Sequence, residues 1–293
     1  MKKVLLTGSN GFTGKYVAKE LESQGYQVVG LVYSNPNEGE VVCDLTDREA
    51  VLGCLDKVRP DYIIHLAALS FVGHSDQKAF YDVNVFGALN LLEAAKSLGL
   101  PLRKVIFASS ANIYGNPTGI SKIKETVLPE PVNHYAMSKL AMEHMTRLWF
   151  EDFPIILTRP FNYTGLGQAE HFLIPKIVSH FKVGASKIEL GNIDVSRDFS
   201  DVRDIARSYA SLLEAPVRSE IVNLCSGNTY SLEYLITMME KIAGYKINIE
   251  VNPNFVRDNE IKVLGGDRTK LYELTNLKPQ INMEQTLLDM FNA

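Results

Sequence analysis

The first fourteen residues constrain the fold more tightly than any other stretch of the chain. Residues 3–7 form an apolar run of strand length, a turn containing Gly8, Gly11 and Gly14 follows, and apolar residues then recur at helical spacing over 16–21. This order of strand, glycine turn and helix suits a pyrophosphate, because glycine lets the backbone approach the ligand and the first helical N–H groups point at the anion. The spacing G-x-x-G-x-x-G differs from the G-x-G-x-x-G of many dehydrogenases, and we interpret it as a dinucleotide-binding turn.

Bulk properties limit the classes of protein that fit. The chain has 293 residues, a hydrophobic fraction of 46% and a mean hydropathy of −0.03, which predict a soluble globular protein of one large domain or a domain plus a smaller lobe. Its net charge of −4 gives no general attraction to nucleic acid or to an acidic membrane. The first apolar run ends at Gly8, which argues against a signal peptide, and no run is long enough to span a bilayer. Cys43, Cys54 and Cys225 are scattered without a CxxC pair, so we expect small buried side chains in a reducing, cytoplasmic compartment.

Apolar runs of strand length alternate with helical patterns along the first half of the chain. The runs lie at 27–32, 41–45, 61–68, 104–108 and 155–158, and the longest helical patterns lie at 76–98 and 135–150. Asn84 and Gly87, both poor helix formers, interrupt the first of these patterns, which we interpret as close packing. The alternation predicts the α/β class, with a Rossmann-type doubly wound parallel sheet.

The alternation is less regular after residue 163, which predicts a smaller C-terminal lobe. We assign 1–163 and about 200–228 to the sheet domain, to which a run at 221–225 can return. The segments at about 164–199 and 229–293, with a strand at 247–251, form the predicted lobe.

The turn after the second apolar run lies where a nucleotide-binding fold meets the adenosine ribose. Tyr33, Ser34 and Asn35 occupy it, and none is the Asp or Glu that an NAD-selective site places on the 2′-hydroxyl. The absence of that charge favours NADP over NAD, although no Arg is present to bind a 2′-phosphate and the segment also fits a plain surface turn. Asp44, at the end of the next run, can accept a hydrogen bond from the adenine amino group or cap the helix that starts near Asp47.

Side chains able to carry proton chemistry follow in a definite order. Ser109 and Ser110 end a predicted strand, and Tyr135 and Lys139 lie four residues apart on one face of the next helix. Such a pair also occurs by chance on a surface helix. We interpret it as a catalytic pair because it follows a glycine turn and a strand-end serine in the chain. His65 lies within a buried type of strand and is interpreted as a core residue. The six histidines form no HxH or HExxH spacing, so we predict no metal site.

Together these segments resemble the extended short-chain dehydrogenase/reductase family of NAD-dependent epimerases and dehydratases, in particular its nucleotide-sugar branch. The resemblance covers nearly the whole chain and rests on T-G-x-x-G-x-x-G at 7–14, Asp44-Leu45, Leu66-Ala67-Ala68, Asn84, Ser109-Ser110 with Tyr114-Gly115, and Tyr135 with Lys139. The segments R-P-F-N-Y-T-G-L-G-Q at 159–168 and R-D-F-S-D-V-R-D at 197–204 look most like the GDP-4-keto-6-deoxy-D-mannose reductases. At 276–279 the chain has N-L-K-P where relatives often have G-W-K-P, a departure that affects packing more than chemistry.

The resemblance implies a role for each matched residue. Tyr135 becomes the general acid/base, Lys139 its partner, and Ser110 the donor to the substrate carbonyl. The implied cofactor contacts are Gly8, Gly11, Phe12, Thr13, Gly14, Tyr33, Ser34, Asp44, Leu45, Leu66, Ala67, Ala68, Asn84, Ser109, Tyr135, Lys139 and Pro160. The implied substrate contacts are Ser70, Ser110, Asn112, Asn162, Arg197 and Arg257, of which the last three match positions that typically contact the diphosphate. Either arginine can instead be a solvated surface charge.

Tyrosine chemistry supports the same assignment. The phenol has an unperturbed pKa near 10, and efficient proton exchange at neutral pH needs a shift of ~3 units, or roughly 4 kcal/mol. One ammonium at ~4 Å in an effective dielectric of ~20 supplies about that much. We therefore expect Lys139 to lower the pKa of Tyr135, and it also has the reach to hold the nicotinamide ribose.

The implied activity is the NAD(P)H-dependent reduction of the 4-keto group of a nucleotide-activated 4-keto-6-deoxyhexose, GDP- or dTDP-linked, in deoxysugar or surface polysaccharide biosynthesis. A dehydratase needs proton-transferring carboxylates beside the catalytic hydroxyl, and Ala111 and Asn112 stand there instead. A 4-epimerase with tightly bound NAD stays open because it needs only the Ser, Tyr and Lys, whereas non-catalytic relatives tend to lose Tyr or Lys. The helices at 76–98 and 135–150 resemble the pair through which many relatives form homodimers.

Overall fold

The computed structural model describes residues 1–70, 75–117, 119–256 and 262–293. Its central feature is a seven-stranded sheet in the order β10-β6-β5-β4-β1-β2-β3, in which every neighbouring pair is parallel. The strands are β1 (Lys3–Thr7), β2 (Gln27–Val32), β3 (Val41–Val42), β4 (Tyr62–His65), β5 (Lys104–Ala108), β6 (Ile155–Pro160) and β10 (Glu220–Leu224). The winding reverses between β1 and β4, so the predicted doubly wound α/β fold is confirmed, including the return of 221–225 to the sheet.

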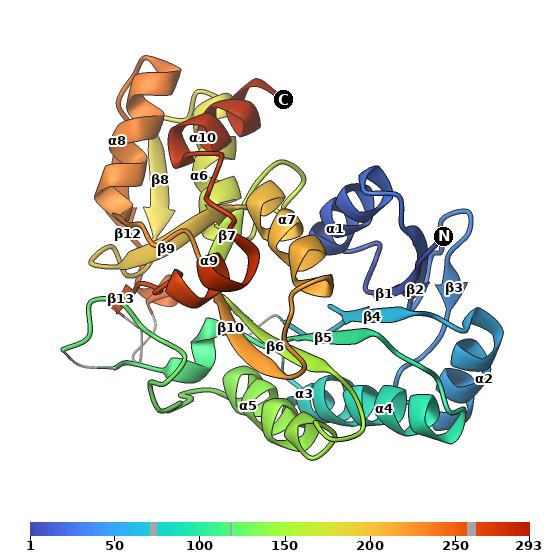
Figure 1. Ribbon diagram of the computed structural model, residues 1–293. Coiled ribbons are helices and arrows are strands. Elements are labelled where there is room, and N and C mark those ends of the chain that lie inside the picture. The colour runs from blue at the N-terminus through green and yellow to red at the C-terminus, as the bar shows by residue number, and fades with distance from the viewer. Residues whose placement is uncertain (71–74, 118, 257–261) are drawn as a thin grey trace.

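Helices cover both faces of this sheet (Figure 1). The helices α1 (Phe12–Ser23), α7 (Val202–Leu213) and α9 (Thr269–Thr275) pack on one face, and α2 (Arg48–Val58), α4 (Gly87–Ser97) and α5 (His134–Arg147) pack on the other. Burial on both faces explains why the strands are continuous apolar runs. The residues of α9 fall in the segment assigned to the lobe, yet Leu271 packs into the core of the sheet. The assignment of 229–293 to the lobe therefore does not hold for α9.

The helical pattern predicted over 76–98 contains a change of helix type. The helix α3 (Gln77–Tyr81) passes into a π-helical segment, η1 (Asp82–Phe86), before α4 begins at Gly87. A Cβ on Gly87 would lie 3.1 Å from the Leu45 Cβ, so the close packing expected at this glycine is confirmed.

Most of the remaining helices and strands form a smaller lobe at the upper left of Figure 1. They are β7 (Asn162–Thr164), α6 (Leu173–Lys182), β8 (Lys187–Leu190), β9 (Ser196–Asp201), β11 (Thr229–Ser231), α8 (Leu232–Ala243), β12 (Asn248–Val251), β13 (Val263–Leu264) and α10 (Met283–Asn292). The strand β9 pairs with β7, β11 and β13, while β8 pairs with β12, so the strand predicted at 247–251 is confirmed. Apolar side chains of α6, α8 and α10 form a core of their own.

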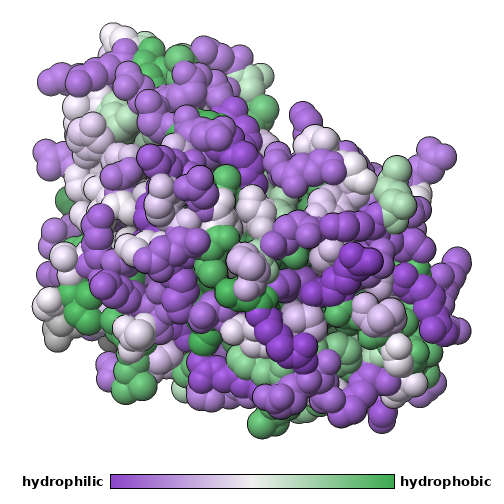
Figure 2. Space-filling view, in the orientation of Figure 1, coloured by the Kyte–Doolittle hydropathy of each residue, from purple (hydrophilic) through white to green (hydrophobic). Residues whose placement is uncertain are grey.

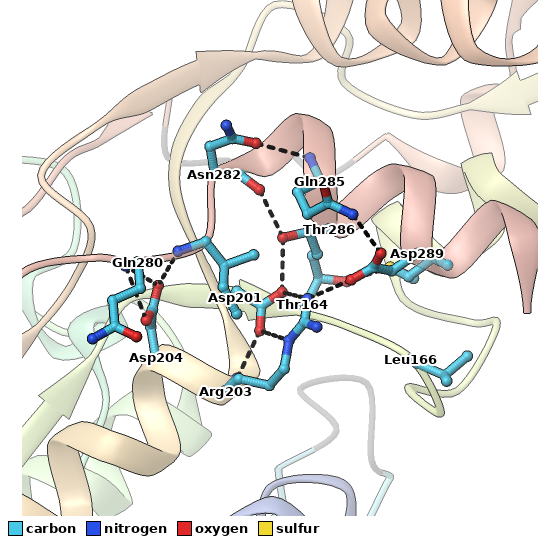
Figure 3. A network of polar contacts seen from close by, with 12 residues as sticks. Thr164, Leu166, Asp201, Arg203, Asp204, Gln280, Asn282, Gln285, Thr286 and Asp289 are labelled. Carbon is cyan, nitrogen blue, oxygen red and sulfur yellow. Dashed lines mark hydrogen bonds and ion pairs between the residues drawn. The ribbon is translucent and has the colours of Figure 1, made fainter.

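A polar network joins the C-terminal helix α10 to the junction of β9 and α7 (Figure 3). Asp201 caps α7 by accepting from the Arg203 backbone N–H at 2.7 Å, and it also accepts from the Arg203 Nε at 2.8 Å and from the Thr286 hydroxyl at 2.8 Å. The same guanidinium reaches Asp289 on α10 at 2.8 Å. Because Asp201 is buried and both of its carboxylate oxygens accept hydrogen bonds, the network fixes α10 against the start of α7.

The face of the molecule in Figure 2 is mainly hydrophilic, with hydrophobic residues scattered over it. Within the described ranges no helix is both long and apolar enough to cross a membrane. The three cysteines are buried and free of disulfides, which confirms them as core side chains.

Candidate active site

A cavity of about 1240 Å³ opens at the carboxyl ends of β1, β4, β5 and β6, where the winding of the sheet reverses. Open α/β sheets bind their ligands at this switch point. The cavity extends to the smaller lobe, where Phe172 and Arg197 line it. Its volume exceeds that of a typical small-molecule pocket, so it has room for a dinucleotide and a second ligand together.

The glycine turn forms part of the cavity wall through Gly8, Gly11, Phe12, Thr13 and Gly14. Gly8 has a φ of +72°, and a Cβ on Gly14 would lie 2.1 Å from the Gly8 carbonyl oxygen. The N-cap of α1 is Gly11, and no side chain of the described chain caps this helix. The first turn of α1 therefore presents backbone to the cavity, which fits the pyrophosphate of a dinucleotide.

Tyr33, Asp44 and Leu45 line the cavity where the adenosine is expected. Asp44 does not cap the next helix, because its Oδ1 accepts from the backbone N–H and hydroxyl of Thr46 at 2.9 and 2.7 Å. The cap of α2 is Asp47, whose side chain accepts from two backbone N–H groups of the first turn. This leaves the adenine contact as the proposed role of Asp44.

Two of the predicted cofactor contacts lie outside the cavity lining. The Ser34 carbonyl accepts from the side-chain amide of Asn10 at 3.2 Å, and Asn10, which the sequence did not single out, lines the cavity instead. Asn84, in η1, is buried; it accepts from the Leu69 N–H at 2.9 Å and donates to the Ser138 hydroxyl at 3.0 Å. Protein groups therefore engage the amide of Asn84, and its contact with a cofactor stays a prediction.

The other predicted cofactor contacts lie in the wall at the strand ends. They are Leu66, Ala67 and Ala68 after β4, Ser109 after β5, Pro160 at the end of β6, and Tyr135 and Lys139 on α5. The small side chains after β4 let the backbone approach a bound ligand closely, as the backbone of a nucleotide site must.

Ser110, Tyr135 and Lys139 lie in the same cavity. Ser110 follows β5 and caps the short helix η2 (Ala111–Tyr114) by accepting from the Asn112 N–H at 3.2 Å. Its hydroxyl also hydrogen-bonds Tyr135. Tyr135 and Lys139 are one turn apart near the start of α5, so both side chains lie on the same face of that helix.

Burial governs the ionisation of this set. It raises the pKa of Tyr135 to about 12, and the hydrogen bond with Ser110 offsets only part of the rise. Lys139 was expected to lower this pKa, but its Nζ donates to the Ala108 carbonyl oxygen at 2.8 Å, and burial outweighs any such effect. Burial also lowers the pKa of Lys139 to about 8, against the opposing charge of Glu143. Tyr135 is therefore protonated at neutral pH.

His65 is a buried core residue, as predicted. Its Nδ1 shares a hydrogen bond of 2.8 Å with the Thr7 hydroxyl, while its Nε2 has no hydrogen-bond partner within the described part of the chain. Burial, followed by the charge of Lys139, lowers the pKa of His65 to about 3. The ring is therefore neutral at physiological pH.

The predicted substrate contacts Ser70, Asn112, Asn162 and Arg197 also line the cavity. Arg197 is not a solvated surface charge: it is 9% exposed, and its guanidinium donates to the Ser196 and Lys262 carbonyl oxygens at 3.0 and 3.2 Å. These contacts hold the guanidinium at the cavity wall on the side of the smaller lobe. Arg257 lies outside the described residues.

Tyr163 is a cavity residue that the sequence did not reveal. Its ring stacks on Phe12 at a centroid distance of 6.2 Å, and its hydroxyl shares a hydrogen bond of 2.8 Å with that of Thr13. Tyr163 lies on β7, so it joins the glycine turn to the smaller lobe. Its place directly after Asn162 was visible in the sequence, but nothing there linked it to a turn 150 residues earlier.

Among the residues with a described position, no group of three or more His, Cys, Asp or Glu side chains is placed to hold a metal ion.

A dinucleotide cradle beside a Ser, Tyr and Lys set, at the carboxyl edge of a doubly wound sheet, defines a nucleotide-dependent oxidoreductase of the short-chain type. The sequence model described as GDP-mannose 4,6 dehydratase matches residues 5–290. The chain therefore belongs to the extended short-chain dehydrogenase/reductase family, which includes the NAD-dependent epimerases and dehydratases.

Similar proteins of this family act on nucleotide sugars. The GDP-6-deoxy-D-talose 4-dehydrogenase of Aggregatibacter actinomycetemcomitans is 38% identical over 270 residues, which cover 92% of this chain and 90% of the relative. The GDP-6-deoxy-D-mannose reductase of Pseudomonas aeruginosa is 32% identical over 296 residues, or 98% of this chain and 95% of the relative.

Solved structures share the whole fold. RMD of Pseudomonas aeruginosa in complex with NADPH has a TM-score of 0.89 at 31% identity, covering 100% of this chain and 98% of that one. A Burkholderia cenocepacia J2315 protein described only provisionally as an epimerase has a TM-score of 0.92 at 43% identity. The match covers 99% of this chain and 97% of that one.

Proposed function

We propose that the protein is an NADPH-dependent reductase of the 4-keto group of a nucleotide-activated 4-keto-6-deoxyhexose. The observation that carries the proposal is the convergence of the glycine turn with Ser110, Tyr135 and Lys139 in one cavity, in which Tyr135 is protonated at neutral pH. Two relatives are named for oxidation or reduction of a GDP-linked 6-deoxyhexose, which favours GDP over dTDP as the activating nucleotide.

Each of the three residues Tyr135, Ser110 and Lys139 has a separate role in such a reduction. A reduced nicotinamide dinucleotide held at the glycine turn supplies the hydride. Tyr135 donates its proton to the oxygen of the carbonyl as negative charge develops there. Ser110, hydrogen-bonded to Tyr135, orients the same oxygen. The Lys139 ammonium would stabilise the phenolate that Tyr135 becomes, and it is the residue that would hold the nicotinamide ribose of a bound cofactor.

The residues around Ser110 argue against dehydration, although the matching family model carries a dehydratase's name. Elimination of water needs a base and an acid beside the catalytic hydroxyl, and Ala111 and Asn112 cannot exchange protons usefully. Of the described residues that line the cavity, Asp44 and Asp82 are the carboxylates. Asp44 lies at the proposed adenosine end, and Asp82 pairs with Lys78.

A 4-epimerase with tightly bound NAD is the second candidate. It would use the same Ser, Tyr and Lys, and the similarity to the provisionally described epimerase favours it. Two observations favour NADPH and net reduction: a similar structure holds NADPH, and the turn at Tyr33–Asn35 carries no carboxylate to repel a 2′-phosphate.

A cofactor balance separates the two candidates. The purified protein is mixed with NADPH and a GDP-linked 4-keto-6-deoxyhexose, with dTDP-, UDP- and CDP-linked 4-keto sugars as comparisons. We expect one NADPH to be oxidised for each sugar reduced, and no 4-keto-6-deoxy product from a sugar nucleotide that still has its 4-hydroxyl. If no keto sugar is reduced, while a 4-hydroxy sugar nucleotide is interconverted without net cofactor use, the epimerase replaces the reductase.

A further inference from the structure

A buried ion pair lies one helical turn from Lys139. Arg159 on β6 and Glu143 on α5 have side chains that are 1% and 0% exposed. They pair through two parallel hydrogen bonds, from Nε to Oε1 at 2.9 Å and from NH2 to Oε2 at 2.7 Å. Glu143 follows Lys139 by four residues, so both side chains lie on the same buried face of α5.

The guanidinium of this pair is fixed by further contacts. Its NH1 donates to the Tyr114 hydroxyl at 2.9 Å and to the Glu125 carbonyl oxygen at 3.1 Å, and Tyr114 in turn donates to Asn223 at 2.7 Å. Arg159 also directly precedes Pro160, which lines the cavity. The carboxylate of Glu143 is therefore held in one place by a rigid partner rather than by a mobile side chain.

Stability alone gives no reason for a charged pair at this position. Removing two charges from water costs about as much as their attraction returns, and apolar side chains of similar volume are often as stable. What Glu143 supplies is a fixed carboxylate one helical turn from a buried ammonium, on the same face of α5. Burial lowers the pKa of Lys139 to about 8, and the Glu143 charge opposes that fall.

The other titratable groups around Lys139 offer no such charge. Among the described residues they are Tyr135 on its own helix, His65 on β4, the cavity residues Tyr163 and Tyr209, and Tyr114 and Arg159 behind Glu143. Burial raises the pKa of all four tyrosines, and His65 is neutral, so none of these groups is negative at neutral pH. Glu143 is thus the negative group of this set.

We propose that Glu143 is a positioning residue for the reaction: held by Arg159, its carboxylate balances the charge of Lys139 and keeps that side chain an ammonium at the pH of turnover. The inference rests on the role proposed for Lys139 and not on the identity of the substrate. A purely structural pair would leave the ionisation of Lys139 unchanged when both partners were replaced together.

The ionisation of Lys139 can be measured directly, without substrate. Acetic anhydride acetylates only the neutral amine, so the rate of Lys139 acetylation, followed by mass spectrometry of the whole protein's peptides, titrates this side chain. In the wild type we expect a midpoint near pH 8. In Glu143→Gln we expect the midpoint to fall by about one pH unit, and in the double variant Glu143→Leu with Arg159→Met, which also removes the positive charge of Arg159, we expect a smaller fall. In Glu143→Asp, which keeps the charge, it should stay close to the wild-type value.

The matched control is Arg203→Met, which breaks an ion pair with the buried Asp201 in the network of Figure 3. It should lower the melting temperature without moving the Lys139 midpoint. Unchanged midpoints in Glu143→Gln and in the double variant would overturn the proposal, and so would a wild-type midpoint below about pH 7, a measurement that requires no variant to fold. Because the labelling uses no sugar nucleotide, it stands whether the chain proves to be a reductase or an epimerase.

Discussion

At the scale of single residues, removing the hydroxyl proton of Tyr135 is the most direct test of the site. Tyr135→Phe keeps the ring but removes the proton and the hydrogen bond with Ser110. Turnover should fall about 10²–10⁴-fold, the usual range for a lost general acid, while NADPH binding should change little. Steady-state kinetics together with a cofactor titration measure both. Near-normal turnover in a folded variant would remove Tyr135 from the mechanism.

The residue after Tyr33 tests the choice of cofactor. Ser34 stands beside the proposed ribose position, and its carbonyl accepts a hydrogen bond from the Asn10 side chain. We expect the wild type to accept NADPH at least as well as NADH. Ser34→Asp should shift the ratio of kcat/KM values towards NADH, through bonding to the 2′-hydroxyl and repulsion of the phosphate. A wild type that strongly prefers NADH would contradict this interpretation of the turn.

The residues predictable from sequence are those whose chemistry depends on local order. The glycine turn and the Tyr135 and Lys139 spacing are of this kind, because a turn and one helix face fix their geometry. For Asn84 the sequence offered both close packing and a cofactor contact; it could not reveal the bond to Ser138, because that bond depends on how η1 and α5 pack. The expected shift in the pKa of Tyr135 was wrong in direction: a fall was expected, but burial by the whole cavity wall raises this pKa.

At the scale of elements, Tyr163 connects α1 of the sheet domain to β7 of the lobe. Tyr163→Phe deletes the 2.8 Å hydrogen bond to Thr13 in the glycine turn. We expect NADPH to bind about 1 kcal/mol more weakly, or roughly fivefold in Kd. The matched control is Tyr16→Phe, on the helix α1 that also carries Thr13. This variant loses a hydroxyl that donates to the Leu166 carbonyl at 2.8 Å, outside the cavity lining. Equal effects of the two variants would argue against a role for Tyr163 in the site.

The π-helical segment and α5 offer a surface for self-association. Phe86 in η1 is 53% exposed and Met137 in α5 is 44% exposed, and the two elements pack together. We propose a homodimer through this face, with a solution mass of about twice the 32.7 kDa chain at micromolar concentration. Phe86→Glu with Met137→Glu should yield monomers, whereas Val183→Glu, 79% exposed after α6, should not. A wild type that sediments as a monomer would contradict the proposal.

The ends of helices and strands were predictable wherever the pattern of apolar residues marks them. The strands at 3–7, 27–32 and 104–108 match the structure because both faces of the sheet are buried. The π-helical turn at Asp82–Phe86 has no periodic signature of its own, since the apolar pattern continues through it. This segment packs against α5, a contact that no local pattern encodes.

At the scale of the whole molecule, the sheet was predictable from the sequence, but the way the smaller lobe covers the cavity at the strand ends was not. Alternating strands and helices imply a doubly wound sheet, because parallel strands need crossover helices. How 162–201 folds back over the strand ends depends instead on pairings such as Asn162 with Phe199, which bring distant segments together. Arg197 shows the consequence: sequence left it open as a surface charge, and this closure buries it in the cavity wall.

Arg197 therefore provides the test of how the lobe contributes to substrate binding. Arg197→Ala should raise KM for the sugar nucleotide about 10- to 100-fold, because a charge-assisted contact to the diphosphate is worth ~1.5–3 kcal/mol. The kcat should change less, since that contact is the same in the ground state and the transition state. Arg197→Lys, which keeps the charge but loses the guanidinium NH1 that donates to both the Ser196 and Lys262 carbonyls, should have an intermediate KM. Circular dichroism and melting temperature control for folding, and NADPH affinity should stay unchanged. A folded Arg197→Ala enzyme with an unaltered KM would place the diphosphate elsewhere in the cavity.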